Sequence, residues 1–373
     1  MSKDIFGRKK PIRELFKIAL FLDLVHKEFI LLSIWRRCNW RCCEGQASAS
    51  LLPRADRAKR KGYRMNEKKQ SNQHKSNNIS RRNMLKMAAG TSAAAVGLVS
   101  CASIEENRRP AVSQGRINQS IAQWCFAEYW NLEKMCQVAK GLGCKSIELV
   151  GPNDFATLKK HGLVCALAPN GMPDPPFVKG FNNPQYHDAV VGATRQTIDA
   201  CAEYGFPAVI AFTGFREDIP DDVGAQNCVT GLKKIIGHAE KKKVNLCLEI
   251  LNSRVDVEMK GHPGYQGDHT DYCMDIIRKV GSPRMKLLFD IYHVQIMDGD
   301  VISRIRQDKD YIGHYHTAGC PGRNEIGNRQ EINYRAIMQE IARTGYTGYV
   351  GQEFIPTGDP LESLTEAVRL CDV

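Results

Sequence analysis

From about residue 117 to the C-terminus, short apolar or β-branched runs alternate with longer stretches whose apolar residues recur at helical spacing. Parallel strands covered on both faces have apolar sequences, and the helices packed against them have one apolar face. The short runs predict eight strands, at residues 117–125, 146–150, 164–168, 208–213, 245–251, 286–292, 312–317 and 349–354. The stretches between them predict eight helices, at residues 132–142, 155–161, 187–204, 225–242, 270–280, 301–308, 334–343 and 360–370.

Eight strand–helix pairs predict an α/β fold, a (β/α)8 TIM barrel over residues 116–373, since that architecture takes roughly 250 residues. Glycines stand where predicted helices must end, at Gly143, Gly162, Gly205, Gly281 and Gly345. The longest irregular segments, 169–186, 252–268 and 318–333, follow strands, so we expect them around an active site at the C-terminal face. An open doubly wound sheet is the alternative fold, but no GxGxxG motif follows the first strand.

The positive charge of the chain belongs to its first hundred residues. Residues 1–100 contain 22 Lys and Arg against 7 Asp and Glu, whereas the whole chain of 373 residues has a formal net charge of +11. The remainder is therefore mildly acidic and has no basic stripe. This charge distribution argues against a nucleic-acid partner.

Residues 65–101 resemble a bacterial twin-arginine export signal with a lipoprotein box. Arg81 and Arg82 precede a small, uncharged apolar run at 87–99, and residues 98–101 (LVSC) place Cys101 where a lipid would be attached. The resemblance implies an exported, periplasmic protein whose membrane contact is a lipid anchor at Cys101. The alternative is an alanine-rich disordered tether.

The segments on either side of this signal complete the predicted domain order. Residues 1–64 carry a charge-interrupted apolar stretch and a basic run, and Met65 opens a normal signal start. We therefore interpret 1–64 as a gene-model extension or a disordered segment, the alternative being a membrane-surface segment. Residues 102–115 are expected to be a linker, so that the barrel follows a largely disordered export leader.

Four polar residues occupy equivalent places near the ends of the last four predicted strands: Glu249, Asp290, His316 and Glu353. They are 41, 26 and 37 residues apart, about one strand–helix unit each. Neighbouring barrel strands should aim them at one point in the barrel mouth. Three carboxylates and one imidazole suit one divalent ion such as Mn²⁺, Mg²⁺ or Co²⁺. The fourteen cysteines show no CxxC zinc spacing, and those inside predicted strands, such as Cys125, Cys165 and Cys247, are expected to be small buried side chains.

Four segments around these residues resemble the xylose isomerase-like barrel superfamily, and within it the hydroxypyruvate isomerases most: 247–252, 287–295 (LLFDIYHVQ), 313–323 (GHYHTAGCPGR) and 351–356 (GQEFIP). The resemblance implies that Glu249 and Glu353 bind the metal and form the catalytic proton-transfer pair, with Asp290 and His316 completing the metal sphere. Hydroxypyruvate isomerases often carry Gln where His316 stands, whereas His is usual in ketose 3-epimerases. The resemblance thus leaves the substrate open between a keto acid and a sugar.

Three further residues are candidates for substrate binding. The resemblance implies that His293 contacts a substrate oxygen and that Arg323 holds an anionic or hydroxyl end of the substrate. A guanidinium can bind a carboxylate in a bidentate manner. His262 lies in a loop that could cover the site, whereas His314 is assigned to the core. The expected activity is proton transfer through an enediolate stabilised by a metal, and a homo-oligomer is compatible with the sequence.

Two rival functions use the same barrel. An endonuclease IV-like phosphodiesterase needs additional metal-binding histidines after the seventh strand, and residues 320–331 contain none. A non-catalytic sugar-binding lipoprotein would lack one of the ligands, and none is missing. The sequence therefore favours an isomerase or epimerase acting on a small sugar or keto acid.

Overall fold

The computed structural model describes residues 110–373. The predicted extension at 1–64, the export signal at 65–101 and the lipid-bearing Cys101 lie outside the described residues. No helix within residues 110–373 combines the length and the apolar character needed to cross a membrane.

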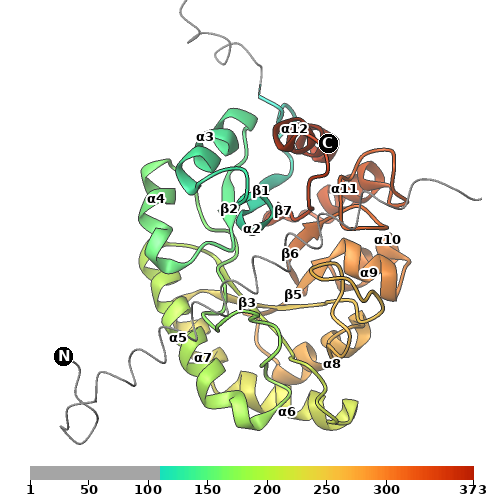
Figure 1. Ribbon diagram of the computed structural model, residues 1–373. Helices are drawn as coiled ribbons and strands as arrows, with labels where there is room; N and C mark the ends of the chain where they lie inside the picture. Colours follow the sequence, from blue (N-terminus) through green and yellow to red (C-terminus); the bar gives the residue numbers. More distant parts are fainter. Residues whose placement is uncertain (1–109) are drawn as a thin grey trace, which may run out of the picture. The chain divides into compact units, whose positions relative to one another are not determined.

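The described chain forms a parallel sheet that curls into a barrel, with helices in a ring around it (Figure 1). Its seven strands pair in the order β2-β1-β7-β6-β5-β4-β3. The strands are β1 (Asn118–Ala122), β2 (Ser146–Glu148), β3 (Ala208–Ala211), β4 (Asn245–Glu249), β5 (Met285–Asp290), β6 (Ile312–Thr317) and β7 (Tyr349–Gln352). The predicted TIM-barrel fold is confirmed.

The segment 164–168 was predicted to be a regular strand, and this detail is wrong. It closes the barrel between β2 and β3 through two single bridges, Ser146 to Val164 and Ala168 to Val209. Between these bridges the backbone N–H of Ala166 donates to the side-chain Oγ of Ser146 at 2.9 Å. This side-chain contact supplements the backbone hydrogen bonds of the seam, which include those from the N–H of Leu149 to the carbonyl of Leu167 at 2.8 Å and from the N–H of Ile210 to the carbonyl of Ala168 at 2.9 Å.

The predicted helices are present as α3 (Leu132–Leu142), α4 (Phe155–Lys160), α5 (His187–Tyr204), α6 (Asp221–Lys233), α7 (Ile236–Lys242), α8 (Thr270–Val280), α10 (Val301–Asp308), α11 (Tyr334–Arg343) and α12 (Pro360–Cys371). The single helix predicted at 225–242 is divided into α6 and α7. The five helix-ending glycines all adopt positive φ, as expected.

Two short helices interrupt apolar runs that were predicted to continue as strands. The segments are α2 (Gln123–Phe126), which follows β1, and α9 (Ile291–Met297), which follows β5. Asp290 starts α9 because its carboxylate accepts a hydrogen bond from the backbone N–H of His293 at 3.0 Å. Cys125 therefore lies in a helix and not in a strand. The ten cysteines of the described chain are all free and buried.

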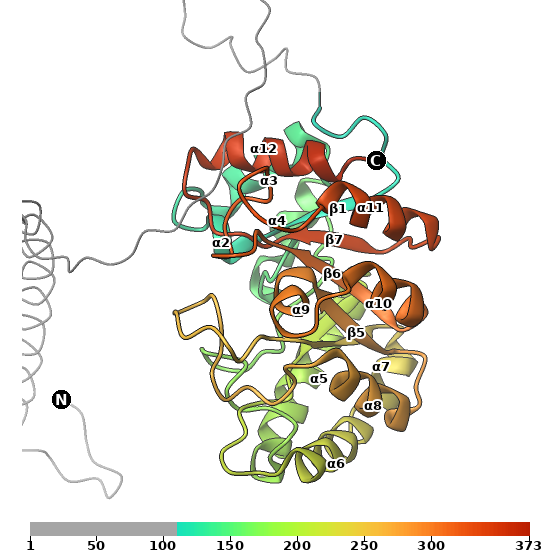
Figure 2. The same ribbon diagram turned by 90° about the vertical axis from the view of Figure 1, so that its right-hand side faces the viewer.

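The end of the predicted linker is fastened to the barrel. The carboxylate of Asp372 accepts hydrogen bonds from the backbone N–H groups of Ser113, Gln114 and Gly115 at 2.6 to 2.8 Å. The two ends of the described chain are therefore joined, and these bonds hold the pKa of Asp372 below its ordinary value although burial opposes them. The loop between β4 and α8 projects on the same side as α2, at the carboxyl ends of the strands (Figure 2).

Candidate metal centre

The four predicted ligands meet at the carboxyl ends of β4 to β7. Glu249, Asp290 and His316 lie at or near the last position of their strands, and Glu353 directly follows β7. One ligand atom from each lies within 4.8 Å of the others, and all four side chains are buried. The Nδ1 atom of His316 is 3.0 Å from Oε2 of Glu353, 3.3 Å from Oε1 of Glu249 and 3.9 Å from Oδ2 of Asp290.

Strand register explains this convergence. Asp290 pairs directly with His316, and Glu249 pairs with Leu288 two residues before Asp290. Parallel strands that start and stop together place their terminal side chains at one rim of the barrel. The register thus produces the geometry that the spacing in the sequence predicted.

The arrangement fits a divalent cation. Oδ2 of Asp290 and Nδ1 of His316 are buried and have no hydrogen-bond partner. Buried polar atoms without partners are rare and costly, and here both face the same group of carboxylates. Oxygen and imidazole donors are the ligands that Mg²⁺, Mn²⁺ and Co²⁺ accept.

The pKa shifts of the three carboxylates also fit a bound cation. Burial raises the pKa of Glu249 to about 7 and that of Asp290 to about 6 in the absence of a metal. Burial also opposes ionisation of Glu353, but the charges of His316 and Arg323 outweigh it and hold the pKa of Glu353 well below its ordinary value. A bound cation would keep all three carboxylates ionised.

Arg323 lies beside this group and is tightly held. Its Nη1 donates to the carbonyl oxygen of Met259 at 2.6 Å, and its Nη2 donates to Oε2 of Glu353 at 2.5 Å. The guanidinium also packs over the rings of Trp124 and Tyr292, at 5.2 and 5.9 Å from their centroids. Trp124, which the sequence did not single out, donates through Nε1 to the other oxygen of Glu353 at 2.9 Å.

His293 is fully buried behind Asp290 and does not line the cavity. Its Nδ1 accepts a hydrogen bond from the backbone N–H of Asn252 at 2.9 Å. Burial lowers the pKa of His293 well below its ordinary value, so the ring is neutral and carries its proton on Nε2. That Nε2 has no hydrogen-bond partner and lies 3.8 Å from Oδ2 of Asp290. The structure therefore presents an unused donor toward the metal centre.

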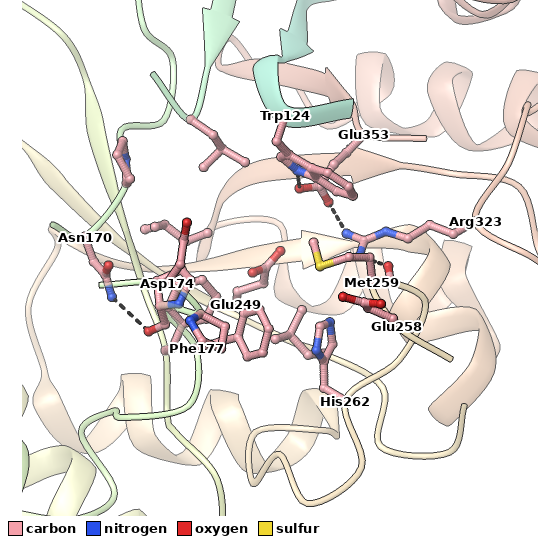
Figure 3. A pocket seen from close by; sticks show the side chains of 17 residues that line it. Trp124, Asn170, Asp174, Phe177, Glu249, Glu258, Met259, His262, Arg323 and Glu353 are labelled. Atoms are coloured by element: carbon pink, nitrogen blue, oxygen red, sulfur yellow. Dashed lines mark hydrogen bonds and ion pairs between the residues drawn. The ribbon is translucent and has the colours of Figure 1, made fainter. Parts of the chain in front are cut away.

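A cavity of about 510 Å³ opens beside the two glutamates. Its polar side includes Glu249, Glu353, Arg323 and His262, and Figure 3 shows Asn170 and Asp174 across the cavity from Arg323. The rest of the wall is mainly apolar, formed by Trp124, Leu149, Pro169, Pro175, Pro176, Phe177, Ile210, Phe212, Leu251 and Met259. Such a volume accepts a small-molecule ligand.

His262 lies on the cavity wall, as the loop prediction anticipated. Its ring contacts Phe177 edge to face with centroids 4.3 Å apart, so the loop after β4 packs on the segment 169–186. Burial lowers the pKa of His262 to about 4. The imidazole therefore offers a neutral donor and acceptor to a bound molecule.

The sequence analysis missed Glu148, a fully buried residue at the end of β2. Its Oε1 accepts hydrogen bonds from Nε2 of His316 at 2.8 Å and Nε2 of His314 at 3.1 Å. Although burial raises it, these histidines lower the pKa of Glu148 to about 2. A carboxylate inside an otherwise apolar strand was the available signal. His314 is buried, as its predicted core role requires.

The fold and this site define a TIM barrel with a carboxylate–histidine centre at the mouth. Residues 136–371 match the family described as xylose isomerase-like TIM barrel, and the chain belongs to this family. It is 37% identical over 94 residues to hydroxypyruvate isomerase of Escherichia coli, which is 25% of this chain and 36% of that protein. It is 32% identical over 144 residues to 2-oxo-tetronate isomerase of Cupriavidus necator, covering 37% of this chain and 52% of the relative.

Among solved structures, D-psicose 3-epimerase of Clostridium cellulolyticum is similar, with a TM-score of 0.53 and 17% identity. The match covers 67% of this chain and 90% of that one. This likeness shows the fold alone. The chain spans about half the length of the curated relatives it matches.

Proposed function

We propose that the protein is a divalent-metal-dependent isomerase of a small sugar or keto acid. The observation that carries the proposal is the convergence of Glu249, Asp290, His316 and Glu353 beside a cavity that two of them line. The names of the relatives, which are isomerases of hydroxypyruvate and 2-oxo-tetronate, support the same class of reaction.

Each residue of the site has its own role in moving a proton between the carbons that flank a carbonyl. Glu249 and Glu353 are the two cavity carboxylates, and one removes the proton while the other returns it. Arg323 and Trp124 hold both oxygens of Glu353 in a fixed orientation. The Nε2–H of His293 faces Oδ2 of Asp290 at 3.8 Å from behind, so His293 would act on the centre through Asp290. The metal, when bound, supplies positive charge that stabilises the negative charge developing on oxygen.

A ketose 3-epimerase is the second candidate, because His316 stands where hydroxypyruvate isomerases often have Gln. Isomerisation and epimerisation share the first proton removal and differ in the carbon, or the face, to which the proton returns. The same pair of glutamates could serve either reaction. The identity of the substrate decides between them.

Incubation in deuterated water tests the proposal. The purified chain with Mn²⁺ is given hydroxypyruvate, four-carbon keto acids and ketohexoses, and proton NMR follows deuterium entering carbon-bound positions. We expect exchange into at least one compound, and that exchange should stop with EDTA. If no compound takes up deuterium with Mn²⁺, or when Mg²⁺ or Co²⁺ replaces it, the protein is not an isomerase of this kind.

A further inference from the structure

We propose that Glu148 is a positioning residue that fixes the tautomer and orientation of His316 for the metal. This inference rests on the proposed metal-dependent function. It assigns a role to a side chain that touches neither the cavity nor the four ligand atoms of the candidate centre.

The two nitrogens of the His316 ring face different groups. Its Nε2–H donates to Oε1 of Glu148 at 2.8 Å, whereas its Nδ1 faces Glu249, Asp290 and Glu353 and has no hydrogen-bond partner. Although burial opposes them, the surrounding carboxylates raise the pKa of His316 in the metal-free protein. A cation bound at Nδ1 would replace the proton there and leave a neutral ring with one N–H and one lone pair. Because the carboxylate of Glu148 requires the N–H, the lone pair belongs to Nδ1 and points at the centre. A carboxylate behind a metal-binding histidine has this effect in metal sites generally.

A glycine on the intervening strand leaves the space that this contact needs. Glu148 is on β2, and it reaches His316 on β6 by passing over Gly351 of β7. A Cβ atom at Gly351 would lie 2.0 Å from Oε1 of Glu148 and 2.9 Å from Cδ2 of His316. Any side chain at this position would therefore push apart the two groups that must meet.

Glu148 is itself held in place. Nε2 of His314 lies 3.0 Å from its Oε2 and 3.1 Å from its Oε1, so the carboxylate is fixed between two imidazoles. His314 and His316 are two positions apart on β6 and therefore point to the same face. All three side chains are at most 1% exposed. Such a buried network restricts rotation of the His316 ring.

The decisive measurement is metal affinity of the folded protein. In calorimetric titration of the full chain, Glu148→Gln should weaken Mn²⁺ binding by about 10- to 100-fold. The matched control is Glu340→Gln, which removes a carboxylate bonded to Arg306 on the outer helices and should leave the affinity unchanged. Unchanged Mn²⁺ affinity in Glu148→Gln, with only a lower melting temperature, would reduce Glu148 to a structural residue. A stoichiometry of two ions would also overturn the proposal, because Glu148 would then be a ligand.

Two further readouts keep the inference testable if that variant does not fold. Nitrogen-15 NMR of labelled histidines in the Mg²⁺-loaded wild-type chain should show the His316 proton on Nε2, and a proton on Nδ1 would contradict the proposal. Gly351→Ala should also weaken Mn²⁺ binding, while Gly237→Ala, where an added Cβ meets no atom within 4 Å, should not. Equal Mn²⁺ affinities in these two alanine variants would contradict the claim that Gly351 leaves room for the contact between Glu148 and His316.

Discussion

Arg323 and Glu353 form an ion pair inside the candidate centre, with Nη2 of Arg323 2.5 Å from Oε2 of Glu353 and both side chains at most 4% exposed. Because of this ion pair, the two cavity glutamates differ in their pKa in the metal-free protein. Glu353 is held ionised, whereas burial raises the pKa of Glu249 to about 7 when no metal is bound. The two carboxylates that should exchange a proton thus start from different electrostatic environments.

Loss of the Glu353 carboxylate should abolish turnover without unfolding the barrel. Glu353→Gln keeps the shape of the side chain but removes its basicity, so we expect kcat to fall by about 10²- to 10⁴-fold. Deuterium exchange measures the loss, and circular dichroism checks the fold. The control is Glu128→Gln at an exposed position. Full activity in Glu353→Gln would remove this residue from the mechanism.

Removing Arg323 should cost stability as well as activity. Arg323→Met leaves Glu353 buried without its partner, and breaking a buried pair in this way costs about 3–5 kcal/mol. Urea unfolding of the metal-free chain measures the change. Arg306→Met, at a pair whose arginine is 60% exposed, should change stability little. Similar midpoints for the two variants would show that the Arg323 pair does not stabilise the fold.

The contribution of Glu249 and Asp290 to the stability of the metal-free protein should fall as the pH rises toward neutrality, whereas the lowered pKa values of His262 and His293 act in the opposite direction. The raised pKa values of Glu249 and Asp290, about 7 and about 6, exceed those of the unfolded chain, which are near 4. Their contribution is therefore fully present below about pH 4 and is lost as the pH rises through 6 and 7. Glu148, with a pKa of about 2, titrates below this window. Thermal unfolding with EDTA across this range is therefore compared between the parent chain and Glu249→Gln, and the difference between the two slopes belongs to Glu249. Equal slopes would contradict the raised pKa of Glu249.

Metal should reverse that trend. A divalent ion binds the ionised carboxylates, so raising the pH removes competing protons. We therefore expect Mn²⁺ to raise the melting temperature more at about pH 8 than at about pH 5. An equal increase at both values would indicate that the ion binds elsewhere on the chain.

The export prediction concerns residues outside the described part of the chain, and it remains a proposal. If Cys101 carries a lipid, Cys101→Ala should move the protein from the membrane fraction to the soluble fraction of cells that express the full chain. Cys125→Ala, a buried cysteine of the barrel, is the control. A cytosolic location for both the parent chain and the Cys101 variant would contradict the export signal.

The ligand set could be predicted because each member stands at the end of its own apolar run, and the fold repeats that position at every strand. Glu148 also ends its strand, but it lies outside the last four strands that were compared, and its two histidine partners are contributed by a strand more than 160 residues away. The short helices α2 and α9 were missed for a different reason. Their residues are as apolar as the strands that they follow, so hydrophobicity alone does not mark the change from strand to helix.

The contacts between side chains in the centre could not be predicted from the sequence pattern. The spacing predicted that Arg323 would be available to a substrate, but it could not show that Met259 and Glu353 already occupy two of its donors. Likewise, His293 was expected in contact with substrate, and the structure places it behind Asp290. Both outcomes depend on how the loops after β4 and β6 fold, and loop conformation is set by contacts that lie far apart in the chain.

The seam at 164–168 leads directly into the segment 169–186, which supplies Phe177 and much of the apolar cavity wall. The four candidate ligands lie on β4 to β6 or directly after β7, and none belongs to this wall segment. Substitutions or length changes in the wall can therefore alter which molecules fit without replacing a ligand. A barrel divided in this way can acquire new substrates while keeping one proton-transfer chemistry.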